Sequence, residues 1–393
     1  MINNMIAKRI ETVQNKLKEK KEPSAFIITS EVNRRYMTNI STSSGYVIIT
    51  PENKYFFTDS RYIEFAKKSL GDIYIVELYP KKDKEKEYYN DLLKKENINN
   101  ILYEENYIYL NAKKRFDKLF DGFVLSESEN LLEKMREIKD LFEIENITEA
   151  QNITDNAFTY ILKVISSGLN TITEKDIAVE LEYYMKKNGA DNIAFETIAV
   201  SGKKSSYPHG QPENIKLSKG FLTMDFGAKY NGYCADMTRT VCIGEPDKKM
   251  LEVYNIVKSS QIAALDMIKA GIEGVEVDKK SRGIIREANY GKNFGHGLGH
   301  SLGLEIHENP SFPLSLTEEE QKKAEELKKA KKDKKDKTEK SKEKLLLAEN
   351  MIITVEPGIY IEDEFGVRIE DLVVIKSDNC VNLTKSDKDL IIL

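Results

Sequence analysis

Short apolar runs and helical patterns alternate in the first third of the chain. Five apolar runs of strand length, separated by polar or turn-forming residues, predict β-strands. These runs are residues 24–29, 45–50, 55–58, 73–78 and 101–104. Residues 61–70 and 88–95 show the apolar spacing of helices between them. We therefore expect a small α/β domain over residues 1–128, and it shows no catalytic constellation.

Helical spacing dominates after the charged stretch 131–140. Thr173 and Asp176 form an approximate capping box, which marks the start of a helix that stops at Gly189. Further helices are predicted over residues 144–167, 250–269 and 275–289. Strand patterns follow at residues 221–228, 233–243, 351–361 and 366–375. The remainder of the chain is thus expected to mix helices and strands.

Residues 318–344 follow neither pattern, because nearly all of them are Lys, Glu or Asp. Glutamates precede lysines by three or four positions, as in a solvated helix that has little to bury. An inserted charged arm without chemistry is the expected interpretation. The alternative is a docking arm for RNA or another acidic partner, which the near balance of acidic residues and lysines disfavours.

Composition and charge exclude several classes of protein. The net charge of −5 lacks the basic excess of a general nucleic-acid-binding protein. The apolar runs are too short to cross a bilayer, and residues 1–22 are polar with the spacing of a helix face, unlike a signal peptide. Three cysteines without a CxxC pair fit a reducing compartment. We expect a cytoplasmic protein without nucleic-acid or membrane partners.

Two aspartates within strand patterns are the first candidates for chemistry. Asp225 and Asp236 lie on either side of Asn231-Gly232, which is a strong hairpin signal. Folding about this turn brings the two carboxylates close together on adjacent strands. Buried carboxylates in contact repel each other, so that either one binds a proton or a cation lies between them. A divalent metal is the favoured hypothesis.

Histidine is concentrated in one stretch of the chain. None of the four histidines precedes His209, and the other three lie within twelve positions: His296, His300 and His307. The first two of these belong to a glycine-rich segment, where the backbone can approach a ligand closely. One such histidine alone would fit a turn, but the cluster favours a site. Nitrogen beside carboxylate ligands suits Mn, Co, Zn or Fe better than Ca or Mg.

Two glutamates complete the candidate set. Glu356 ends an apolar strand where Pro357-Gly358 forces a turn, and Glu370 shares a strand face with Arg368. A buried Arg–Glu pair is the structural alternative for Arg368. With the two aspartates and one imidazole, these carboxylates are sufficient to hold two cations that share a water molecule.

These motifs, in this order, resemble the metallopeptidase family that includes aminopeptidase P and prolidase. The family pattern is Asp, ten residues, Asp, then His, Glu and Glu, and it is matched by Asp225, Asp236, His300, Glu356 and Glu370. The resemblance covers nearly the whole chain. It implies an α/β (α+β) fold with a creatinase-like domain over residues 1–128, a pita-bread catalytic domain over residues 129–393 and a charged insertion at about 318–344.

The resemblance also implies roles. The five matched residues would ligate two divalent ions, with Mn²⁺ expected first and Co²⁺ or Zn²⁺ as alternatives. Glu356 would in addition shuttle the proton of a bridging hydroxide, and Arg368 would brace Glu370. The remaining histidines match positions beside the substrate: His209, His296 and His307. Tyr233 and Thr238 are weaker matches near the site.

A pH dependence follows from the histidine ligand. Only neutral imidazole ligates a metal, and an unperturbed histidine has a pKa of about 6.5. We therefore expect activity to fall below roughly pH 6 as His300 is protonated.

The implied reaction is hydrolysis of the bond between an N-terminal residue and proline, by attack of a metal-bridging hydroxide. Residues 58–62 resemble the corresponding segment of the family's aminopeptidases, which favours an Xaa-Pro aminopeptidase. An Xaa-Pro dipeptidase (prolidase) shares every ligand and stays the alternative. Methionine aminopeptidases share the ligands but usually lack such an N-terminal domain. A non-catalytic binding module on this scaffold would have lost ligand carboxylates, and here none is missing. A peptide with proline at the second position is the expected partner, and a homodimer the expected assembly.

Overall fold

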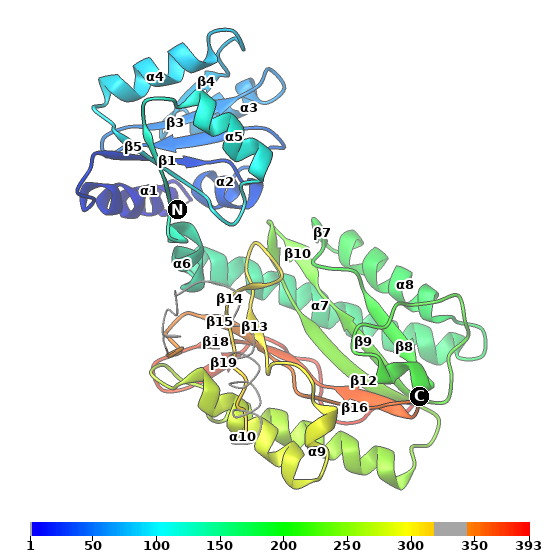
Figure 1. The fold of residues 1–393 in the computed structure, drawn as a ribbon. Coiled ribbons are helices and arrows are strands. Elements are labelled where there is room, and N and C mark those ends of the chain that lie inside the picture. Colours follow the sequence, from blue (N-terminus) through cyan, green and yellow to red (C-terminus); the bar gives the residue numbers. More distant parts are fainter. Residues whose placement is uncertain (1, 318–343) are drawn as a thin grey trace. The chain divides into compact units, whose positions relative to one another are not determined.

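The computed structural model of the protein describes residues 2–317 and 344–393 (Figure 1). The chain divides into two units, Met1–Met135 and Arg136–Leu393. The predicted insertion at 318–344 lies outside the described residues except for Lys344, so its role stays a prediction. Within the described ranges, no helix is both long enough and apolar enough to span a membrane.

The first unit is built on a six-stranded mixed sheet in the order β4-β3-β2-β1-β5-β6. The central strand β1 pairs antiparallel with β2 and parallel with β5. The strands are β1 (Ser24–Ile28), β2 (Tyr46–Ile49), β3 (Lys54–Thr58), β4 (Ile75–Leu78), β5 (Asn100–Tyr103) and β6 (Val124–Glu127). The five strands expected in this region are thus confirmed, and β6 is an addition.

Helices accompany this sheet, and the first buries the apolar face that its sequence predicts. In α1 the apolar positions Ile6, Ile10, Val13 and Leu17 are all at most 2% exposed. The helices of this unit are α1 (Ile2–Lys18), α2 (Glu31–Thr38), α3 (Ile63–Leu70), α4 (Glu85–Lys95) and α5 (Leu110–Leu119). A sixth helix, α6 (Leu131–Glu137), crosses the division between the two units.

Four long helices frame the second unit, in two pairs (Figure 1). They are α7 (Leu141–Gly168), α8 (Glu174–Lys187), α9 (Lys248–Leu265) and α10 (Gly274–Glu287). The first pair shares a hydrophobic core with strand residues between positions 199 and 243, and the second pair shares another with the C-terminal strands. The capping box predicted from Thr173 and Asp176 is confirmed at the start of α8, where each side chain bonds the other residue's backbone N–H.

The strands of the second unit lie between these helix pairs in small sheets. Their orders are β12-β9-β8, β11-β10-β7, β14-β13-β15-β18-β19 and β16-β17. The strands before α9 are β7 (Asn192–Ile193), β8 (Ile198–Ser201), β9 (Gly220–Phe226), β10 (Ala228–Tyr230), β11 (Tyr233–Cys234) and β12 (Met237–Ile243). Those after α10 are β13 (His300–Ser301), β14 (Glu308–Ser311), β15 (Ile352–Val355), β16 (Gly358–Ile361), β17 (Phe365–Arg368), β18 (Asp371–Ile375) and β19 (Cys380–Asn382).

The predicted hairpin around Asn231-Gly232 forms, with one interruption. β10 pairs with β11 next to the turn, and β9 pairs with β12 farther from it, with Asp225 opposite Thr238. Gly227 lies between the two ladders, and a Cβ there would be 1.9 Å from the carbonyl oxygen of Ala235. Asp236 occupies the matching interruption between β11 and β12, which turns its carboxylate out of the regular ladder.

The two C-terminal strand predictions are also interrupted, and both glutamates lie at the interruptions. The last pair of one ladder is Val355 with Asp371, and the first pair of the next is Gly358 with Arg368. Glu356 and Glu370 are among the few residues between these ladders. Four predicted ligands therefore come from strands or strand ends whose positions are fixed by regular pairing on either side.

We predict that Gly299→Ala destabilises the protein, because a Cβ there would lie 2.1 Å from the backbone oxygen of Thr354 on β15. Overpacking of this kind costs about 1–3 kcal/mol of unfolding free energy. Gly295→Ala is the matched control, since nothing lies within 4 Å of its added Cβ. Urea unfolding measures both variants, and equal stabilities would contradict the close approach.

Candidate metal centre

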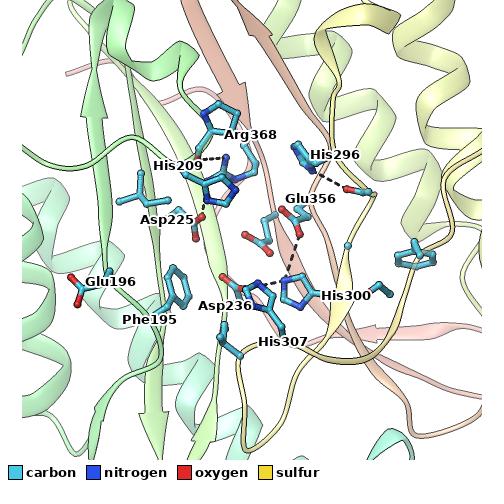
Figure 2. Close-up of a pocket in the computed structure, with 18 of the residues that line it drawn as sticks. Phe195, Glu196, His209, Asp225, Asp236, His296, His300, His307, Glu356 and Arg368 are labelled. Carbon is cyan, nitrogen blue, oxygen red and sulfur yellow. Dashed lines mark hydrogen bonds and ion pairs between the residues drawn. The ribbon is translucent and has the colours of Figure 1, made fainter. Parts of the chain in front are cut away.

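A cavity of about 660 Å³ lies in the second unit and collects the predicted site residues (Figure 2). Its volume is that of a typical small-ligand pocket. All the residues proposed from the sequence as ligands or catalytic groups line it: His209, Asp225, Asp236, His296, His300, His307, Glu356, Arg368 and Glu370. The structure thus brings together side chains that are up to 161 positions apart in the sequence.

Three of these residues converge closely enough to share one cation. Asp236, His300 and Glu370 each offer a ligand atom, and these atoms all lie within 4.8 Å of one another. Nε2 of His300 is 3.7 Å from Oδ2 of Asp236 and 3.6 Å from Oε1 of Glu356. Figure 2 shows the imidazole of His300 between these carboxylates. The nitrogen that faces them is the atom that a metal would use.

A backbone carbonyl on the side of the ring away from the carboxylates fixes the tautomer of His300. Its Nδ1 lies 3.0 Å from the backbone oxygen of Ser301, and a carbonyl oxygen only accepts, so Nδ1 carries the hydrogen. In the neutral imidazole, Nε2 then has no hydrogen and its lone pair is free. This is the usual arrangement for a histidine that ligates a metal. Burial lowers the pKa of His300 to about 4, so the expected protonation near pH 6 moves to about pH 4.

The carboxylates of the cavity are crowded and poorly hydrated. Burial raises the pKa of Asp236 well above its usual value, and Glu370, Asp225 and Glu356 raise it further. Burial likewise raises the pKa of Glu370 well above its ordinary range, and Glu356 adds to this. For Glu356 burial is again the largest cause, and its pKa rises to about 8. Without a cation, the site can relieve this repulsion only by binding protons.

The described residues fit a divalent metal. Oδ1 of Asp225 and Oδ1 of Asp236 are buried and have no hydrogen-bond partner among the described residues. A buried carboxylate oxygen without a partner is costly, and a cation removes that cost. Carboxylate oxygens with one imidazole nitrogen form the donor set expected for Mn, Co, Zn or Fe.

Arg368 balances part of this negative charge. Its Nη2 donates to Oδ2 of Asp225 at 2.6 Å, and its Nε donates to Oγ1 of Thr238 at 2.9 Å. Thr238 in turn donates to Oε2 of Glu370 at 2.7 Å. Arg368 therefore reaches Glu370 through Thr238, while its direct ion pair is with Asp225.

Tyr360 belongs to this network, although it was not among the residues predicted from the sequence. Its hydroxyl accepts from Nη1 of Arg368 at 2.8 Å and lies 3.0 Å from Nε2 of His296. Nδ1 of His296 faces the backbone oxygen of Gly297 at 2.8 Å and must donate to it, so Nε2 accepts from Tyr360. Burial lowers the pKa of His296 to about 4, and Arg368 adds to this effect, so the ring is neutral at neutral pH.

His209 lies on a loop that one buried carboxylate holds at both ends. Oε1 of Glu174 accepts from the backbone N–H of Ser201 at 2.7 Å, and Oε2 accepts from the backbone N–H of Glu213 at 3.3 Å. Lys204 also donates to Oε2, at 2.9 Å. The loop begins with a short 3₁₀ turn, Gly202–Ser206. His209 is thus presented to the cavity from a fixed loop.

The other predicted near-site residues have different positions. The ring centroids of His307 and His300 are 4.5 Å apart, and both rings lie near Asp236 (Figure 2). Tyr233 does not line the cavity; it is 1% exposed and packs edge-on against Phe142. Thr238, by contrast, touches both Arg368 and Glu370.

Fold and site together define a metal-dependent peptidase built on the pita-bread fold with a creatinase-like N-terminal domain. The model of metallopeptidase family M24 matches residues 145–377, and the creatinase/prolidase N-terminal domain matches residues 9–138. The chain belongs to metallopeptidase family M24. The α/β fold class and the family resemblance expected from the sequence are confirmed.

Proline-specific peptidases are among the most similar proteins. An Xaa-Pro dipeptidase of Pyrococcus horikoshii is 33% identical, over 100% of this chain and 99% of its own length. The structure of an Xaa-Pro dipeptidase from Bacillus anthracis is 34% identical with a TM-score of 0.85, covering 99% of this chain and 100% of that one. That of an X-Pro aminopeptidase from Thermotoga maritima is also 34% identical, with a TM-score of 0.81, covering 94% and 98%.

We predict that the metal-free protein loses stability as the pH rises from about 5 to about 8. Glu356 titrates at about 8 in the folded state and near its ordinary value of 4.5 when unfolded, so between these values the folded state binds more protons. Thermal melting in EDTA at pH 5, 6, 7 and 8 measures how steeply stability falls with pH. Each kcal/mol of lost unfolding free energy lowers the melting temperature by roughly 2–4 °C. Glu356→Gln should flatten this pH dependence.

The exposed Glu349 supplies the control for this slope. Glu349→Gln should leave the pH dependence of melting as in the wild type. A slope that is the same in the wild type and in Glu356→Gln would show that Glu356 does not hold the extra proton.

Proposed function

We propose that the chain is a two-metal Xaa-Pro aminopeptidase whose metal ligands are Asp225, Asp236, His300, Glu356 and Glu370. The observation that carries the proposal is the convergence of these side chains in one cavity, where buried oxygens of two of them have no hydrogen-bond partner in the described part of the chain. Membership of family M24 supports it, because metal-dependent peptide hydrolysis defines that family.

A bound metal pair supplies Lewis-acid polarisation of the scissile carbonyl and a water-derived nucleophile at neutral pH. We propose Mn²⁺ as the native ion, with Co²⁺ and Zn²⁺ as alternatives. This chemistry suits a bond to proline, because the amide of proline has no N–H to which a peptidase could form a hydrogen bond. Carbonyl polarisation needs no such N–H.

Proton transfer falls to Glu356 and the histidines in this proposal. Oε1 of Glu356 lies 3.4 Å from Oγ1 of Thr354 and 3.6 Å from Nε2 of His300, at the centre of the carboxylate cluster. A carboxyl group that can hold a proton near neutral pH suits a general base that later acts as an acid. His209 and His307 reach the cavity from opposite loops, where they can donate to the reacting amide.

His296 and Arg368 act as orienting groups. Tyr360 donates to Nε2 of His296, so this neutral ring presents a fixed edge to the substrate and carries no charge. Nη1 of Arg368 donates to the backbone oxygen of Pro208 at 3.2 Å, which ties the His209 loop to the carboxylate cluster. Both residues therefore keep the cavity in shape around a bound peptide.

Apolar side chains give the cavity a wall for the proline ring. Phe195, Ile198, Ile306 and Phe312 are the apolar residues among those that line it. Such a wall removes the pyrrolidine carbons from water without needing hydrogen bonds. A peptide with proline at the second position is accordingly the proposed substrate.

The charge of the cavity favours an aminopeptidase over a dipeptidase. Among the described residues that line it, Arg368 is the one arginine and there is no lysine. Its guanidinium is already bonded to Asp225, Thr238, Tyr360 and the Pro208 backbone. A dipeptide would bring its proline carboxylate into this acidic cavity without a dedicated cation. A longer peptide has a neutral amide at that position.

The Xaa-Pro dipeptidase is the second candidate, and the names of two of the similar proteins favour it. The homodimer and the cytoplasmic location expected from the sequence stay predictions. A binding module without metal is disfavoured, because every ligand carboxylate is present in the cavity.

We predict that Asp236→Ala abolishes metal binding and peptide cleavage while the chain still folds. Loss of an outer partner of a ligand already weakens metal binding by about 10–100-fold, so loss of a ligand should exceed about 100-fold. Metal content by mass spectrometry, circular dichroism and peptide turnover measure this. Asp266→Ala, at an exposed position after α9, is the control and should retain metal. Full turnover in Asp236→Ala would refute the ligand assignment.

We also predict that tripeptides of the Xaa-Pro-Xaa type are cleaved with a higher kcat/KM than the corresponding Xaa-Pro dipeptides. An unpaired buried polar group costs about 1–3 kcal/mol, which corresponds to a decrease in rate of roughly five- to 150-fold. Matched peptides with and without the third residue measure the ratio with Mn²⁺. Xaa-Ala-Xaa peptides control for proline specificity. Preference for the dipeptide would establish the dipeptidase instead.

A further inference from the structure

The hairpin β13–β14 has two faces of different chemistry. His300 and His307 turn their rings toward the cavity. The residues that follow them, Ser301 and Glu308, do not line the cavity. Ser301 and Glu308 are paired across the hairpin and their side chains are buried. The underside of the histidine hairpin therefore carries a hydroxyl and a carboxylate that face the protein interior.

A lysine without solvent exposure reaches this underside. The side chain of Lys139 is 0% exposed, and its Nζ donates to Oγ of Ser301 at 2.7 Å. The same Nζ lies 3.5 Å from Oε2 of Glu308. Its own backbone N–H donates to the oxygen of Asn350 at 3.0 Å, just before β15. Lys139 thus joins both strands of the histidine hairpin to the neighbouring strand connection.

A second cation completes the cluster. Nη2 of Arg136 donates to Oε1 of Glu308 at 2.5 Å and to Oε2 of Glu305 at 2.8 Å. Oε1 of Glu308 also accepts from the backbone N–H of Glu305 at 3.1 Å. Burial would raise the pKa of Glu308, but Lys139 and Arg136 together hold it below its usual value. Glu308 is therefore an ionised carboxylate in a paired setting.

The cluster joins two cationic residues to several carboxylates. Burial lowers the pKa of Lys139, and the carboxylates of Glu308 and Glu143 oppose this effect. Arg136 and Lys139 are each paired with Glu308. What these contacts fix is geometry, because each one holds an atom of the hairpin at hydrogen-bond distance.

The contacts of Lys139 reach the proposed metal ligand His300 through Ser301. Ser301 accepts from Lys139 with its side chain and accepts from Nδ1 of His300 with its backbone oxygen. Movement of Ser301 would move the carbonyl that sets the tautomer and the orientation of the His300 ring. Outer partners of metal-ligating histidines tune metal affinity in this way.

We propose that Lys139 is a positioning residue for His300 and acts through Ser301. This inference rests on the proposed function, in that His300 is taken as a metal ligand. Arg136 and Glu308 support the same hairpin on the His307 side. None of these three side chains lines the cavity, so their effect reaches the metal through the hairpin and not through contact with the substrate.

Binding of Co²⁺ to the purified metal-free protein tests the proposal, because visible absorption of Co²⁺ reports its ligand field. Lys139→Met keeps an unbranched apolar chain but removes the donor, and Ser301→Ala removes the acceptor while keeping the backbone oxygen. Each variant should weaken Co²⁺ binding by about tenfold and alter its spectrum. The double variant should be no worse than Lys139→Met alone, since Ser301→Ala removes only a hydrogen bond that Lys139→Met has already removed.

Val257→Ala is the matched control, because it opens the core beside α9 and destabilises the protein without touching the hairpin. It should lower the melting temperature and leave the Co²⁺ affinity and spectrum unchanged. Wild-type affinity and spectrum in Ser301→Ala overturn the proposal, even if Lys139→Met fails to fold. Additive losses in the double variant overturn it as well.

The outcome of this experiment is separable from that of the proposed function. A wild-type protein that binds Co²⁺ but cleaves no Xaa-Pro peptide refutes the proposed substrate and leaves the role of Lys139 intact. A wild-type protein that binds no Co²⁺ refutes the metal centre, and with it the positioning role.

Discussion

Repulsion between carboxylates that share one buried cavity is the main physical constraint on this structure. Two unit charges about 4 Å apart repel by roughly 4 kcal/mol at an effective dielectric constant of 20. Asp236, Glu356 and Glu370 are held together against such repulsion: burial raises their pKa values, and neighbouring carboxylates raise them further. Positive charge must therefore enter the cavity, either as protons or as metal ions, and the chemistry of the site depends on which of these it is.

The fold resists this repulsion by anchoring the carboxylates where strand pairing resumes. Asp236, Glu356 and Glu370 each lie beside a strand end, so the backbone on at least one side is held in a ladder. Behind them Arg239 donates from Nη1 to the backbone oxygens of Thr238 and Glu370. These carboxylates consequently have little freedom to separate when no metal is present. A preorganised site of this kind suits tight binding of a cation.

Sequence patterns predicted which acidic residues line the cavity, because acidic residues are unusual in apolar strands. Most helices and strands also followed from their periods, but α2 was not foreseen, since its eight residues are largely polar. Tyr360 was missed because a tyrosine in a strand fits an ordinary core. Lys139 was missed because it belongs to a charged stretch, which predicts solvated side chains. Periodicity reports which face is buried, whereas the partner of a buried polar group depends on the tertiary fold.

The course of α6 bears on how such chains can recombine during evolution. This helix starts in one unit and ends in the other, and Arg136 and Lys139 follow immediately after the division. An ancestor that exchanged its N-terminal unit for a different one would have had to break the gene before the codon for Arg136. A crossover only a few codons later would have replaced the residues that hold the histidine hairpin. An exchange that keeps these contacts must therefore fall before Arg136, within the first part of α6.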